Sequence, residues 1–167
     1  MARNVLFILG VGSIGWAMLS LFFAGALLPD WMGLAHESRG PLYIESMAVN
    51  VGLWCALGAF ALFGAVFQRL RLAAALTFVV CGAGFSAGRI LAMVRGAKPD
   101  IYTVIALALE VAVVVAASAG YVSERTRIAR QAKELEKAEK AALEAALAAA
   151  HTATPVGAPT PPPVQQP

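Results

Sequence analysis

Residues 82–100, GAGFSAGRILAMVRGAKPD, join the end of one long apolar run to the start of the next. Arg89 lies inside the first of these runs, directly after Gly84-x-x-x-Gly88. The connection near Pro99 is short, and a short connection makes two flanking helices antiparallel neighbours. This stretch therefore predicts a pair of packed helices with an arginine inside the apolar layer.

The composition around that pair is typical of a membrane protein. Of 167 residues, 59% are hydrophobic and 14% are charged, and the mean hydropathy is +0.71. A hydrocarbon core about 30 Å thick needs about 20 consecutive apolar residues to cross it as a helix. Four runs reach that length, at residues 5–28, 42–67, 72–94 and 101–122. We therefore expect an all-α polytopic membrane protein in which residues 4–122 form a four-transmembrane-helix bundle.

Basic residues next to the runs predict the orientation. One side of the bundle carries Arg3, Arg69, Arg71, Arg125, Arg127, Arg130 and Lys133, and the other carries Arg39, Arg95 and Lys98. Seven against three places both termini in the cytoplasm. The net charge of +3 is small and these basic residues lie beside apolar runs, so nucleic acid is not an expected partner. An alternative is that the first run is a cleaved signal peptide ending near Ala24-Gly25-Ala26, but the run is longer than such segments usually are.

The chain changes character after the fourth run. Residues 123–150 are rich in Ala, Glu and Lys, which favour helix, and Glu136 and Lys140 are spaced for an i,i+4 ion pair. We expect a charged cytoplasmic helix that continues the fourth span. Ile128, Leu135 and Ala142 form a weak heptad seam, so a single solvated helix is favoured over a coiled coil. Residues 151–167 are rich in proline and are predicted to be a disordered tail.

Small residues recur at helical spacing in every span. Because lipid is as apolar as leucine, helices in a bilayer associate through close backbone approach and polar contacts. The predicted helix-packing positions are Gly52, Gly84, Gly88, Ala112 and Ala116. Such ladders indicate a tight bundle or contact with a partner protein, and they imply no chemistry.

Three charged residues fall inside the predicted spans. Counting about 1.5 Å per residue from the span ends, Glu45 lies roughly 5 Å deep, Arg89 roughly 7 Å and Glu110 roughly 14 Å. All three occupy one leaflet, and a carboxylate as deep as Glu110 needs a partner or a proton. We expect a bidentate contact between Arg89 and Glu110.

Other polar residues of the spans are expected to complete this intramembrane cluster. They are Glu45, Asn50 and Tyr43, with Tyr102 as a further candidate. Two readings of the cluster remain open. It is a structural ion pair that fixes the bundle, or it is a polar pocket for a ligand head group or a proton. An arginine that extends to the interface is a further alternative.

No catalytic, metal or cofactor site is predicted. His36 and Glu37 lie in the first loop, but adjacent residues diverge and zinc requires three or four ligands. No nucleophile-and-base pair or phosphate-binding loop can be assembled from the remaining residues. The chain is therefore not expected to be an enzyme, and no cofactor is expected.

The order of features resembles an uncharacterised domain-of-unknown-function family of small bacterial four-helix inner-membrane proteins. The resemblance rests on HESRGPLYIE, GRI, GAKP and ALALEVAVV, and covers roughly residues 4–122. The matching positions are Arg39, Gly40, Tyr43, Gly88, Arg89, Gly96, Pro99 and Glu110; at Glu45 the family usually has a small residue. It implies a multi-pass protein of the bacterial inner (plasma) membrane and names no activity.

Two functions follow as hypotheses. The first is a non-enzymatic accessory or structural subunit, whose partners are the lipid bilayer and other membrane subunits or a second copy of itself. The alternative is a small transporter or a lipid- or small-molecule-binding protein that uses Arg89 and Glu110.

Overall fold

The computed structural model describes residues 1–27 and 41–152, and these residues are helical apart from short connections. The elements in chain order are α1 (Ala2–Leu27), α2 (Pro41–Met47), the π-helical segment η2 (Ala48–Leu53), α3 (Trp54–Val66), the 3-10 turn η3 (Gln68–Leu70), α4 (Arg71–Val94) and α5 (Ile101–Thr152). The predicted His36-Glu37 pair, Arg39, Gly40 and most of the proline-rich tail lie outside the described residues.

Four helices are long and apolar enough to cross a membrane. These candidate spans are Ala2–Phe23, Tyr43–Val66, Gln68–Val94 and Ile101–Ala150. The prediction of an all-helical fold with four apolar spans is therefore confirmed for the described part of the chain. The third span ends at Val94, and the turn that follows contains Gly96, whose φ of 98° lies in the left-handed region that glycine tolerates.

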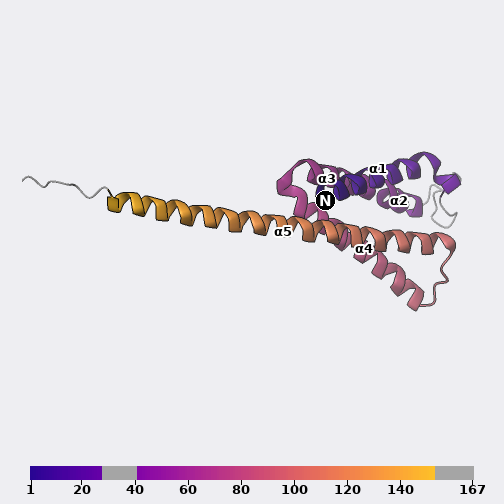
Figure 1. The fold of residues 1–167 in the computed structure, drawn as a ribbon. Helices are drawn as coiled ribbons and strands as arrows, with labels where there is room; N and C mark the ends of the chain where they lie inside the picture. Colours follow the sequence, from indigo (N-terminus) through magenta and orange to yellow (C-terminus); the bar gives the residue numbers. More distant parts are fainter. Residues whose placement is uncertain (28–40, 153–167) are drawn as a thin grey trace, which may run out of the picture. The chain divides into compact units, whose positions relative to one another are not determined.

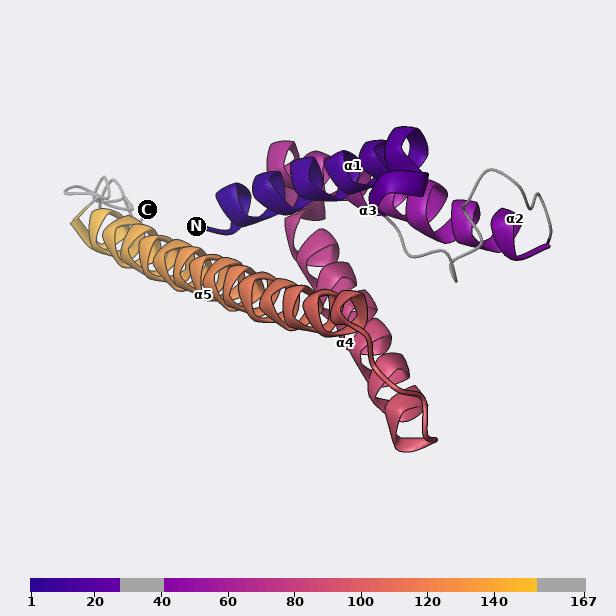
Figure 2. The ribbon, with the colours of Figure 1, turned by 90° about the vertical axis from the view of Figure 1, so that its right-hand side faces the viewer.

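The chain divides into two compact units, Met1–Thr126 and Arg127–Pro167. In the first unit α1 lies along α3, as both views show (Figures 1 and 2). Glycines permit this approach, because a Cβ added to Gly58 would lie 2.8 Å from the carbonyl oxygen of Gly10. A Cβ added to Gly64 would likewise lie 2.5 Å from the Cβ of Ala74 at the start of α4. Backbone packing at glycine therefore holds α1, α3 and α4 together.

The glycines that the sequence favoured for packing are not the ones that bring the helices of this chain together. Gly52, Gly84 and Gly88 are exposed, and a Cβ on any of them would meet nothing within 4 Å. Ala112 is also exposed, and Ala116 is only half-buried. The prediction is wrong for contacts within the chain, because four-residue spacing recurs around a helix and does not say which stripe faces a neighbour.

The core of the first unit is made mostly of small residues, and large apolar side chains lie outside. The buried cluster is Leu6, Leu57, Ala61, Ala65, Ala74, Ala75, Phe78 and Ala117. Large side chains such as Phe7, Phe22, Val80 and Leu109 are exposed. This distribution suits a bilayer, where small residues let helices approach and large apolar ones face lipid.

The second span contains an irregularity that the sequence did not predict. Asn50 is buried in the π-helical segment η2, and its side-chain amide donates to the carbonyl of Ser46 at 3.0 Å. In an α-helix that carbonyl would accept the backbone N–H of Asn50. A side chain competing for the same carbonyl is a local alternative to the helical hydrogen bond. We attribute the wider turn of η2 to this competition.

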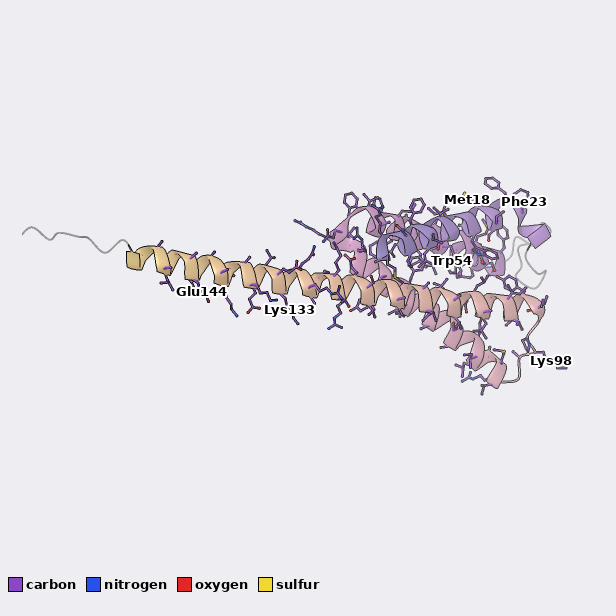
Figure 3. All side chains as sticks on the ribbon, viewed as in Figure 1. Met18, Phe23, Trp54, Lys98, Lys133 and Glu144 are labelled. Carbon is purple, nitrogen blue, oxygen red and sulfur yellow. The ribbon has the colours of Figure 1, made fainter. Side chains whose placement is uncertain are left out.

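In the second unit α5 continues to Thr152, and every residue from 128 to 150 is exposed. The predicted Glu136–Lys140 ion pair is present at 2.7 Å. Lys133 and Glu144 in Figure 3 mark this charged part of α5.

Candidate functional site

An ion pair joins α4 to α5 at the predicted position. The Nε of Arg89 donates to Oε1 of Glu110 at 3.0 Å. The Glu110 side chain is 8% exposed and that of Arg89 is 26% exposed. The expected bidentate geometry is wrong, because a single hydrogen bond links the two groups and Glu110 Oε2 is buried without a hydrogen-bond partner in the described part of the chain.

Several aromatic side chains lie in the same region of the first unit as Arg89. The Tyr102 side chain interacts with the guanidinium group of Arg89, and its ring lies 6.5 Å from that of Trp16. Trp54, labelled in Figure 3, stacks on Phe85 of α4 at a centroid distance of 5.9 Å. Three helices and the span containing η2 thus contribute side chains to the region around Arg89.

These residues line a cavity of about 580 Å³ between α1, α3, α4 and α5. Volumes of this size hold drug-sized or lipid-like ligands. Its polar lining residues are Ser13, Trp16, Asn50, Arg89, Tyr102 and Glu110. The remaining lining is mainly aliphatic and aromatic and includes Leu57, Phe78, Cys81 and Val113. The cavity can therefore hold an apolar body beside a charged group.

The divergence of α4 from α5 helps to create this space. The two helices are close at Gly82, where an added Cβ would lie 2.8 Å from a methyl group of Val114. Beyond that point they separate towards the turn that precedes α5 (Figures 1 and 2). Arg89 lies seven residues beyond Gly82 on α4, and its side chain reaches Glu110 of α5 and lines the cavity.

Exposed apolar residues form part of the cavity wall. Ile8 of α1 is 69% exposed, and Ile105 and Leu109 of α5 are 54% and 60% exposed. These wall residues also reach the protein surface, so the cavity is open to the apolar surface of the first unit.

The rest of the predicted cluster is only partly assembled. Asn50 lines the cavity, and Tyr102 does so as well. Tyr43 and Glu45 are not among the lining residues, and Glu45 is exposed on α2. The expectation that these two complete the cluster is wrong, because α2 ends before η2 and only η2 and α3 bring the second span to the cavity.

Sequence reasoning missed a second ion pair between α4 and α5. Arg71 Nη1 lies 3.4 Å from Oε1 of Glu124, and Arg71 Nε donates to the carbonyl of Gly64 at 3.4 Å. The two side chains are 13% and 5% exposed. Both residues had been assigned to segments that flank the membrane. The signal available in the sequence was the antiparallel arrangement of the two helices. From Arg89 and Glu110, 18 residues back along α4 leads to Arg71, and 14 residues forward along α5 leads to Glu124.

No family model, no curated protein and no solved structure matches this chain. The resemblance to the uncharacterised inner-membrane family therefore stays a prediction.

Proposed function

We propose that this chain is an integral membrane protein that binds one lipid-like molecule in its intramembrane cavity. The observation that carries the proposal is the cavity of about 580 Å³, with an apolar lining and Arg89 and Glu110 in its wall. Because its wall residues also reach the apolar surface of the first unit, a molecule dissolved in the bilayer would have a route to the site. This is the binding alternative that the sequence left open.

A purely structural role explains the Arg89–Glu110 pair less well than it explains the Arg71–Glu124 pair. A structural ion pair is expected to be enclosed, with its remaining donors and acceptors satisfied by protein groups. Arg89 instead keeps part of its side chain exposed beside an apolar cavity. A charge in that position favours a ligand with one polar end.

Two glycines of α1 provide a matched test. Gly12 lines the cavity and Gly15 does not, and a Cβ on either residue would meet nothing within 4 Å. Gly12→Phe fills the cavity, whereas Gly15→Phe adds the same side chain to the same helix elsewhere. Lipids that copurify with the wild type in near-stoichiometric amount are expected to be lost from Gly12→Phe and kept by Gly15→Phe, as measured by native mass spectrometry. Equal retention by both variants would exclude the cavity as the site.

A second candidate function is an accessory subunit of a membrane assembly. The observation in its favour is the exposed face of α4 at Gly84 and Gly88, where an added Cβ would meet nothing within 4 Å among the described residues. A stable complex isolated from native membranes that is lost on Gly84→Leu, with the isolated chain still folded, would support this candidate. A monodisperse single chain unaffected by Gly84→Leu would argue against it.

A further inference from the structure

We infer that the cavity selects a single-chain lipid with an oxyanion head group, a carboxylate or a phosphate, and that Arg89 binds that head group. This inference rests on the proposed function, because it names the ligand of the same cavity. It follows from the donors of Arg89, from the length of the cavity and from the charges at its polar end.

The first argument is the hydrogen-bonding capacity left on Arg89. A guanidinium group has five N–H donors and no acceptor. One donor is used by Glu110 Oε1, and the Tyr102 side chain interacts with the same guanidinium group. The terminal nitrogens therefore retain donors, and Arg89 lines the cavity with a quarter of its side chain exposed. Carboxylates and phosphates match the edge of a guanidinium group with two parallel hydrogen bonds.

The second argument is length. The lining of α4 runs from Phe78 to Arg89 and that of α5 from Tyr102 to Val113. Each stretch covers eleven residue steps, or roughly 16 Å at 1.5 Å per residue. Half of a hydrocarbon core about 30 Å thick is about 15 Å. The cavity thus has about the length of one leaflet. Arg89 and Tyr102 lie at one end and Phe78 and Val113 at the other, and Glu110 between them is bonded to Arg89, so an acyl chain can extend from a polar head at the first end.

The third argument is charge. The negative charge of Glu110 lets Arg89 lie inside an apolar layer. The Glu110 carboxylate itself is a poor contact for a ligand, because its Oε2 atom is buried in the protein. A head group at the terminal nitrogens lies closer to the guanidinium group than to the carboxylate beyond it. An anion there is attracted overall, and an ammonium group is repelled. Glu110 is accordingly a positioning residue, and Arg89 is the binding residue.

Brominated chains, which quench tryptophan fluorescence on contact, give a direct test. Trp16 and Trp54 line the cavity, and Trp31→Phe removes the third tryptophan. The protein is placed in phosphatidylcholine vesicles at pH 9 with probes that share one dibromo-octadecyl chain and differ in the head: carboxylate, phosphate monoester, alcohol or amine. Quenching in Gly12→Phe supplies the baseline from probe in the surrounding lipid.

We expect the carboxylate or the phosphate to bind about tenfold more tightly than the alcohol, the difference that a charge-assisted hydrogen bond provides, and the amine to bind weakest. The tighter of the two anions identifies the natural head-group class. Arg89→Gln should abolish the preference. Arg95→Gln, which removes the exposed arginine that directly follows the same helix and is not among the cavity-lining residues, should keep it. Glu110→Gln should tighten carboxylate binding by at least about threefold, because a negative charge near the head group is gone.

Each contrary result has its own meaning. Alcohol binding as tight as carboxylate binding in the wild type, or an anion preference that survives Arg89→Gln, would overturn the inference about the head group while leaving a lipid-binding cavity. Quenching no greater than the Gly12→Phe baseline for all four probes would instead overturn the proposed function.

Discussion

The first unit contains two Arg–Glu pairs between α4 and α5, and their surroundings differ. At Arg71 and Glu124 the region is closed: both side chains are nearly buried, and Arg71 also donates to the backbone at the end of α3. At Arg89 and Glu110 the region is open, because α4 and α5 diverge and a cavity lies beside the arginine. The Arg71–Glu124 pair is thus enclosed by packed helices, whereas the Arg89–Glu110 pair lies beside a cavity.

These two environments suggest two different roles for a buried ion pair, one in stability and one in binding. In the closed region Arg71 joins three helices, since it contacts Glu124 of α5 and Gly64 of α3 from its place at the start of α4. In the open region the ion pair joins only α4 and α5, and part of the arginine remains exposed beside the cavity. We therefore expect the closed pair to matter more for stability and the open pair to matter more for binding.

The largest stability effect is expected from the closed pair. Glu124→Ala leaves Arg71 in a mostly buried position without its carboxylate, and breaking one half of a buried pair costs about 3 kcal/mol or more. Arg71→Ala should cost a similar amount, and the double variant should cost less than the sum of the two. Unfolding in detergent gives all three values. Additive losses would show that the pair is not coupled.

Tight helix packing gives the next effect. Gly58→Ala places a Cβ 2.8 Å from the carbonyl oxygen of Gly10 and 2.7 Å from a side-chain carbon of Ile14. Because the nearest backbone atoms belong to a packed helix and cannot rotate away, we expect a loss of about 2 kcal/mol in the free energy of unfolding. A variant as stable as the wild type would show that α1 and α3 can separate without penalty.

The open pair should give a smaller stability effect. Glu110→Gln removes a charge whose partner is already partly exposed and can extend towards the interface. We expect a loss of about 1 kcal/mol, well below the loss for Glu124→Ala, in the same unfolding assay. A loss equal to that of Glu124→Ala, with full recovery in the Arg89→Ala and Glu110→Ala double variant, would make both pairs structural and would contradict the distinction between them.

The smallest effect is expected at Gly84 of α4, where an added Cβ would meet no other described residue within 4 Å. Gly84→Ala adds a methyl group in open space and should raise the free energy of unfolding by about 0.5 kcal/mol through helix propensity alone. The comparison with Gly58→Ala keeps the substitution constant and changes only the surroundings. A marked loss at Gly84 would reveal a contact with another copy or another protein.

The number of spans and the existence of the open pair were predictable from the sequence. Four apolar runs are long enough to cross a bilayer, and a deep carboxylate such as Glu110 needs a partner or a proton, for which Arg89 of the preceding helix was the simplest partner. The packing glycines were not predictable, because Gly58, Gly64 and Gly82 belong to the same kinds of small-residue ladder as Gly52, Gly84 and Gly88. Which ladder faces a neighbour depends on how each helix is rotated.

The sequence by itself determined that this chain is built from long apolar helices, and it favoured a contact between Arg89 and Glu110, because length, hydropathy and the energetic penalty of an unpaired charge act locally. Only the tertiary structure decided that Arg71 and Glu124 form a second pair and that a cavity lies beside the first. Both depend on the crossing of α4 with α5 at Gly82 and on their separation beyond it. A crossing is a relation between two helices, and no spacing within either one specifies it.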